Sequence, residues 1–195
     1  MTPRVLLALL VWLGLAVLAG AAGLLAAIGP PFPQLVLAAL TIVLLAACRW
    51  LPALRAWALA VDIRALVLFH ATRFVGLYFL VLYARGELPR AFAVPYGWGD
   101  ILVAATALIL AAGSPRRGPG GWWAYLVWNA VGLADILLVV ATAARLGLTV
   151  PGAMRALTIL PLSLLPTFVV PIIIATHVVI FARLRQSRQE AYRAV

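Results

Sequence analysis

The chain has 195 residues, of which 66% are hydrophobic and only 10% are charged, and its formal net charge is +10. A mean hydropathy of +1.13 is higher than soluble globular domains of this length reach. All the basic side chains are arginines, so a lysine Schiff base is excluded. The arginines are scattered between apolar runs instead of forming a basic domain, which favours a polytopic membrane protein over one that binds nucleic acid.

Six apolar runs follow one another along the chain. They cover residues 5–28, 34–48, 61–83, 101–113, 122–146 and 159–182. Since a helix needs roughly 20 apolar residues to cross a bilayer, the first, third, fifth and sixth runs are long enough, and the second and fourth are short. The apolar core of the first run is longer than that of a signal peptide, so we read it as an uncleaved span. We predict a single all-α transmembrane helix bundle over residues 1–195.

The distribution of arginines supports six spans with both termini in the cytoplasm. With six spans, ten arginines lie on the side of the termini and four on the other side, as expected for cytoplasmic loops. Without the fourth span this bias disappears. The two groups are Arg4, Arg49, Arg55, Arg64, Arg116, Arg117, Arg183, Arg185, Arg188 and Arg193 against Arg85, Arg90, Arg145 and Arg155.

Two ionisable residues lie near the middle of predicted spans. Arg73 is in the third run and Asp135 in the fifth, both roughly 18 to 20 Å from the cytoplasmic ends. An isolated charge at this depth costs on the order of 2.5 to 3.5 kcal/mol, so such residues face the protein interior and find a partner. We therefore predict that Arg73 and Asp135 pair, either to lock two helices together or to form a centre that titrates or contacts a substrate.

The two histidines of the chain, His70 and His177, lie at compatible depths in the third and sixth runs. Two imidazoles from different membrane helices can ligate the iron of a b-type haem, with space for the macrocycle supplied by small residues such as Gly76. Small bis-histidine cytochromes b are similar in these two ligands only. The alternative is that each histidine makes a hydrogen bond in helix packing.

Polar side chains also share faces of the last two runs. Trp128, Asp135 and Thr142 recur every seven residues and so lie on one side of a helix. In the sixth run, Thr167 and His177 fall on a similar arc with Ser163, and we expect them to join Arg73 and Asp135 in a buried polar centre. Prolines at 161, 166 and 171 free backbone carbonyls, which predicts either a kinked packing helix or a broken helix that lines a cavity.

The stretch from Gly86 to Asp100, "GELPRAFAVPYGWGD", contains two prolines and three glycines and reads as a long outer loop. In that reading, Asp100 caps the N-terminus of the fourth helix, and the loop could form a lid over the central cavity. The segment of residues 52–62 reads as a cytoplasmic extension of the third helix.

Three stretches, "RFVGLYFL", "GELPRAFAVPYGWGDI" and "LPTFVVPIIIATH", resemble segments of small bacterial six-helix membrane proteins that carry no assigned activity. The resemblance implies the bacterial inner membrane and a six-span bundle, and it transfers no catalytic residue. Nucleophile, phosphate-loop, HExxH and CxxC motifs are missing from the sequence, which disfavours an enzyme.

Three functions remain open. The polar centre could bind a small anionic or amphipathic molecule or conduct protons, in which case a cavity should reach Arg73. The chain could be a b-type cytochrome with His70 and His177 as haem and metal ligands. It could also be an accessory subunit, or a homo-oligomer, in a larger membrane assembly.

Overall fold

A computed structural model of the chain describes residues 3–113 and 119–193, and every regular element in these two segments is a helix. Six helical segments are long and apolar enough to cross a membrane, as the sequence predicts. They are α1 (Pro3–Ala21), α3 (Phe32–Trp50), the segment Ile63–Ala84, α7 (Arg90–Ala112), α8 (Pro119–Thr149) and the segment Leu165–Gln189, which begins in the short helix η3 and continues in α9.

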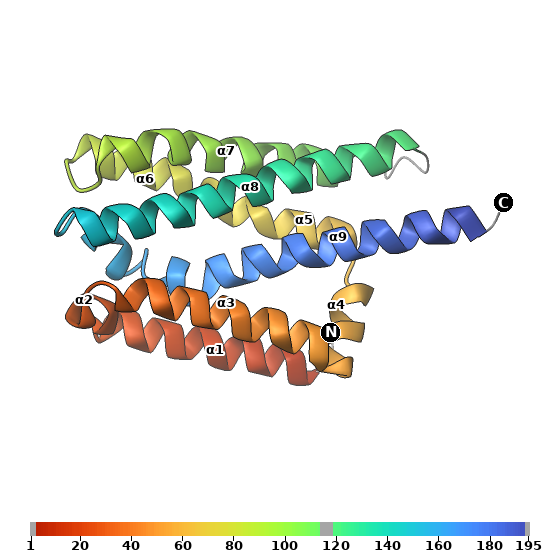
Figure 1. Ribbon diagram of the computed structural model, residues 1–195, viewed down its shortest axis with the longest axis horizontal. Helices are drawn as coiled ribbons and strands as arrows, with labels where there is room; N and C mark the ends of the chain where they lie inside the picture. The colour runs from red at the N-terminus through yellow and green to blue at the C-terminus, as the bar shows by residue number, and fades with distance from the viewer. Residues whose placement is uncertain (1–2, 114–118, 194–195) are drawn as a thin grey trace.

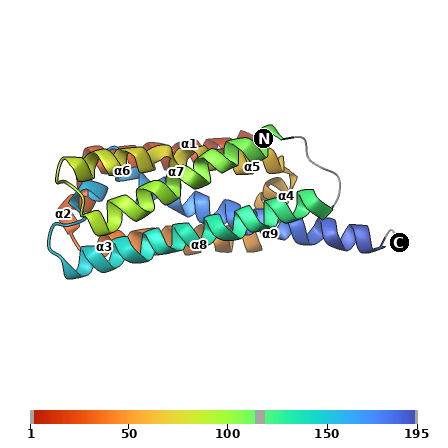
Figure 2. The same ribbon diagram turned by 90° about the horizontal axis from the view of Figure 1, so that it is seen from above.

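The long helices lie alongside one another as an elongated bundle, with the N- and C-termini at the same end (Figure 1). The second view shows the short helix α2 (Leu24–Ile28) and the α6–α7 and α8–α9 connections at the opposite end (Figure 2). α9 (Val170–Arg193) runs through the middle of Figure 1, with α6, α7 and α8 on one side and α1 and α3 on the other. The second view separates α1 from α3 (Figure 2). The arginine-rich loop of residues 114–118, with Arg116 and Arg117, lies outside the described residues.

The third candidate span, Ile63–Ala84, is not a uniform α-helix. It consists of α5 (Ile63–Leu68), a 3-10 segment η1 (Phe69–Phe74) and α6 (Val75–Ala84). Residues three apart eclipse one another in a 3-10 helix, so His70 and Arg73 leave the backbone in similar directions. The preceding segment is a separate helix, α4 (Pro52–Ala60), and not an extension of the span, because the chain turns at Val61 and Asp62 and the Asp62 carboxylate caps α5 by accepting from the Arg64 N–H (2.8 Å).

The prediction of a long outer loop is wrong. The connection between α6 and α7 ends at Pro89, and α7 begins at Arg90 and includes Pro95 and Asp100. A lid formed by this stretch is therefore excluded. Helices inside a bundle tolerate proline and glycine when neighbouring helices pack closely, and α6 and η1 both pack against α7.

The last span begins later than predicted and is broken at its start. Residues 159–163 form a bend followed by turns, and after Leu164 the helix continues in a π-helical turn, η3 (Leu165–Val169). Pro171 has no N–H to donate to the carbonyl of Thr167, and the indole Nε1 of Trp12 on α1 donates to that oxygen instead (2.8 Å). This contact confirms that a neighbour satisfies a carbonyl freed by proline, and it anchors α1 to the rest of the bundle.

Buried polar side chains form a layer between two apolar clusters. One cluster lies toward the loop end and includes Phe79, Phe92 and Val139, and the other lies toward the termini and includes Val67 and Ile180. Four helical segments contribute to both clusters: Ile63–Ala84, α7, α8 and α9. In each of them, the buried polar residues lie between the residues of one cluster and the residues of the other. This polar layer comprises His70, Arg73, Asp100, Asn129, Asp135, Thr176 and His177.

Candidate functional site: a buried ion-pair centre and an imidazole cluster

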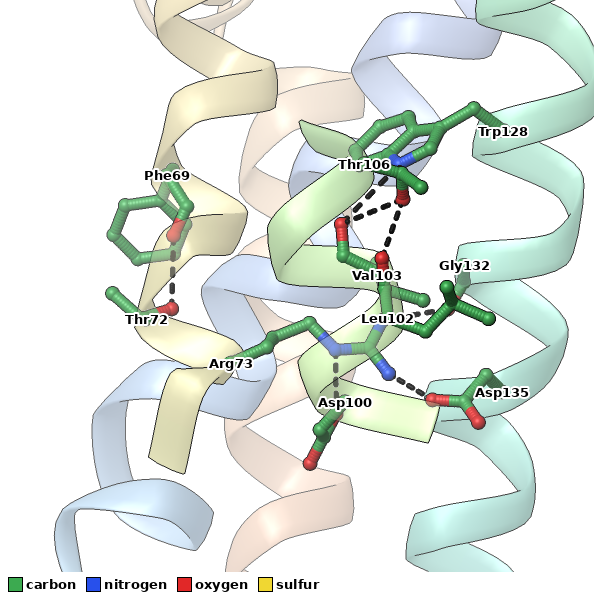
Figure 3. A network of polar contacts seen from close by, with 10 residues as sticks. All are labelled: Phe69, Thr72, Arg73, Asp100, Leu102, Val103, Thr106, Trp128, Gly132 and Asp135. Atoms are coloured by element: carbon green, nitrogen blue, oxygen red, sulfur yellow. Dashed lines mark hydrogen bonds and ion pairs between the residues drawn. The ribbon is translucent and has the colours of Figure 1, made fainter. Parts of the chain in front are cut away.

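Arg73 joins three helices at the centre of the polar layer (Figure 3). Its Nε donates to Oδ1 of Asp100 on α7 (2.6 Å), its Nη2 donates to Oδ2 of Asp135 on α8, and its Nη1 donates to the carbonyl of Gly132 (3.0 Å). The side chains of Arg73 and Asp100 are 1% and 3% exposed, whereas that of Asp135 is 20% exposed. These three charged residues form what we call the ion-pair centre, and its formal charge is one negative unit.

Glycines let the backbones come close enough for the ion-pair centre to form. A Cβ on Gly76 would lie 2.3 Å from the carbonyl oxygen of Gly97, and one on Gly99 would lie 2.4 Å from Oδ1 of Asp135. A side chain at either position would push α7 away from α6 or from α8. Gly97 and Gly99, in the stretch predicted as a loop, are thus contact positions between helices, as small residues commonly are in membrane bundles.

The predicted pairing of Arg73 with Asp135 is confirmed. The prediction that Asp100 caps a helix is wrong, because α7 begins ten residues earlier and carries Asp100 into the bundle, against Arg73. Sequence reasoning missed this second carboxylate. The signal was present, since Asp100 comes directly before an apolar run and would be buried if the helix began before it.

A second polar group, the imidazole cluster, lies beside the ion-pair centre. The ring centroids of His70 and His177 are 4.3 Å apart, and the Trp128 ring lies 5.0 and 5.9 Å from them. Gly132 connects the two groups, because its carbonyl accepts from Arg73 while a Cβ there would lie 2.8 Å from Cε1 of His177.

Hydrogen bonds assign the tautomer of each imidazole. The Thr176 hydroxyl donates to the Ile173 carbonyl (2.8 Å), so it accepts from Nε2–H of His70 (3.1 Å). The Asn129 amide donates to the His177 carbonyl (3.0 Å), so its oxygen accepts from Nδ1–H of His177 (2.8 Å). Nδ1 of His70 and Nε2 of His177 are left buried without a hydrogen-bond partner among the described residues.

The imidazole cluster does not fit a haem between its rings. Metal–nitrogen bonds of about 2 Å would place the centroids of two axial imidazoles about 6 Å apart, with the macrocycle between them. The observed centroids are 4.3 Å apart. The space expected beside Gly76 is occupied by Gly97 of α7. Within the described part of the chain, no three histidine, cysteine or acidic residues gather to hold a metal ion. The proximity of the two histidines was predicted correctly, and their environment is that of helix packing.

The remaining predicted polar residues divide between two places. Trp128, Asp135 and Thr142 do share a face of α8, and this face meets α7, where Trp128 donates to Thr106 (3.2 Å) and the hydroxyls of Thr142 and Tyr96 lie 2.6 Å apart. Thr167 is buried as expected, but it does not join the ion-pair centre, since its hydroxyl donates to the Ser163 carbonyl and its own carbonyl accepts from Trp12.

A cavity of about 700 Å³ lies elsewhere in the bundle, between α3 and α8. Its lining includes Gln34 and Thr41 on α3 and Ala144 on α8, and it includes neither the ion-pair centre nor the imidazole cluster. This cavity does not reach Arg73, and the Arg73 side chain is 1% exposed.

Comparison with known proteins agrees with the expected resemblance to a family without an assigned activity. No curated protein and no solved structure matches the chain. Residues 30–185 match one protein family, and this range includes every residue of the ion-pair centre and the imidazole cluster. The chain belongs to the family described as domain of unknown function DUF8737.

Proposed function

We propose that this chain is an integral membrane protein whose ion-pair centre binds and releases one proton. Large apolar side chains are exposed around the bundle, among them Leu18 (67%), Ile42 (66%) and Ile109 (72%), and they call for a hydrocarbon environment. The six apolar helices span the bilayer in this proposal. The arginine distribution favours both termini in the cytoplasm, and the family resemblance favours a bacterial inner membrane.

The observation that carries the proposal is the presence of two carboxylates on one guanidinium. Arg73 balances one of Asp100 and Asp135, and the second negative charge has no cationic partner among the described residues. An uncompensated charge is costly in a low-dielectric interior, so the centre is most stable when one carboxyl is protonated. A proton needs no cavity, which agrees with the close packing around Arg73.

The two carboxyls differ in access. The Asp100 side chain is almost fully enclosed, while one fifth of the Asp135 side chain is exposed beside Gly99. Asp135 is therefore the group through which the centre exchanges its proton. Arg73 contacts both carboxylates and distributes its charge between them, so that the shared proton can leave without breaking the helix contacts.

Carbon-13 labelling of aspartate side chains tests the proposal directly. The chain has three aspartates, and in solid-state NMR spectra of the protein in lipid we expect Asp62 to give a carboxylate signal and the pair Asp100 and Asp135 to share one protonated signal at neutral pH. Asp135→Asn should remove the protonated signal, and the exposed Glu87→Gln should leave it unchanged. Three carboxylate signals in the wild-type protein would refute the proposal.

A role as an accessory subunit or homo-oligomer is the second candidate, and one observation favours it. Only 6% of the α1 span and none of the α3 span is buried in the bundle, far less than the 56% of the last span. These two helices offer the largest surface to another membrane protein. Mass measurement in mild detergent should then show a multimer or a stoichiometric partner, and a monomeric, partner-free protein would contradict this role.

A further inference from the structure

The cavity between α3 and α8 is a groove with an apolar interior. α3 and α8 each pack against α9, and the groove lies between them with Phe79, Val170 and Ile174 among the residues of its lining. Small side chains in its walls leave this space open, including Ala38 on α3 and Ala144 on α8. Its volume of about 700 Å³ is in the range of small-molecule sites.

The groove becomes polar at its loop end. Gln34 lies in the first turns of α3, and Arg155 and Thr158 lie on the short helix η2 (Arg155–Thr158) that connects α8 to the last span. Arg155 is exposed and forms no ion pair with any residue that the structure describes. Oε1 of Gln34 is buried and has no hydrogen-bond donor there either. The groove thus offers a cation for an anionic group and an acceptor for a hydroxyl group beside an apolar channel.

We infer that this groove binds one anionic phospholipid, with its phosphate at Arg155, a headgroup hydroxyl at Gln34 and an acyl chain between α3 and α8. The groove residues span Pro33 to Ile42 on α3, about 14 Å of helix, so part of one acyl chain is covered. Ile42 is exposed at the edge of the groove, which allows entry from the side, out of the bilayer. This site is separate from the ion-pair centre and does not depend on proton binding there.

Native mass spectrometry of the purified protein tests this site with mixtures of phosphatidylglycerol and phosphatidylcholine. Both lipids carry an anionic phosphate. Phosphatidylglycerol has free hydroxyls and a net negative charge, whereas in phosphatidylcholine the choline cation offsets the phosphate and no hydroxyl is present. We expect the wild-type protein to retain one phosphatidylglycerol with about tenfold preference, because the choline cation of phosphatidylcholine weakens the attraction of its phosphate to Arg155 and supplies no hydroxyl to Gln34. Arg155→Gln should abolish the preference, and Arg145→Gln, at an exposed arginine outside the groove, should keep it.

A second pair of variants tests occupation of the apolar channel. Ala144→Phe fills the groove and should abolish lipid retention, while Ala141→Phe places the same ring on the exposed side of α8 and should not. Equal retention of the two lipids by the wild-type protein, or unchanged retention by Ala144→Phe, would overturn the inference. Arg155 is exposed, so Arg155→Gln leaves the packing intact and decides the headgroup contact even if Ala144→Phe fails to fold.

Discussion

Removal of the arginine from the ion-pair centre should destabilise the bundle in a way that depends on both carboxylates. Arg73→Leu deletes the contacts to Asp100, Asp135 and the Gly132 carbonyl and leaves two buried carboxyls without a cation. Loss of one partner of a buried ion pair costs about 3 to 5 kcal/mol in soluble proteins, and hydrogen bonds between membrane helices average about 0.6 kcal/mol. We expect a loss of about 3 kcal/mol, which lowers Tm by roughly 6 to 12 °C for a chain of this size.

The order of stability among combined variants separates a three-residue centre from a simple pair. Arg73→Leu with Asp135→Leu still leaves Asp100 buried and unpaired, so it should recover only part of the lost stability. Addition of Asp100→Asn removes the last unpaired charge and should recover more. Thermal unfolding in detergent, followed by circular dichroism, measures this order, with the exposed Arg85→Leu as a control that should change little. If the double variant is as stable as the wild-type protein and the triple variant is no better, Asp100 is not coupled to Arg73 and the reasoning fails.

Three further outcomes follow from the packing. Gly76→Ala places a Cβ 2.3 Å from a backbone oxygen of α7 and should lower the free energy of unfolding by about 1 to 3 kcal/mol. Gly14 has open space around it, so Gly14→Ala should leave the free energy of unfolding unchanged. Denaturation of the two variants measures the difference. Trp12→Phe keeps an aromatic ring but removes the indole donor, so α1 should become more accessible to protease, and equal digestion rates would contradict the anchoring role of this hydrogen bond. Reconstitution with haem should give no bis-imidazole absorption band, and a Soret band that disappears in His70→Ala and in His177→Ala would show that the imidazole cluster opens to ligate iron.

Hydropathy and charge placement were sufficient to predict the six helices and the contact between Arg73 and Asp135. The contact followed from the high free energy of an isolated charge in hydrocarbon, which leaves few alternatives to pairing. Asp100 was misplaced because the prolines and glycines before it are helix breakers in water. Inside a bundle, Gly97 and Gly99 permit close helix packing, and α7 continues through Pro95.

Other parts of the site depend on tertiary contacts that no local pattern reveals. Asn129 and Thr176 fix the two imidazole tautomers, yet no periodic pattern in the sequence connects either residue with the histidine that it contacts. The start of the last span was placed too early because residues 159–164 are as apolar as the helix that follows. The groove between α3 and α8 forms because both helices pack against α9. No periodic pattern in the sequence predicts this arrangement of the three helices.

The 3-10 segment η1 makes the third span longer and thinner at the level of the polar layer. Six residues at about 2.0 Å rise instead of about 1.5 Å add roughly 3 Å of length, with hydrogen bonds of poorer geometry than those of an α-helix. Arg73 lies in this 3-10 stretch and joins it to α7 and α8, so the ion-pair centre holds the irregular part of the helix in place. In Arg73→Leu, amide hydrogen exchange should therefore accelerate first at residues 69–74, before it accelerates in the flanking turns of α5 and α6.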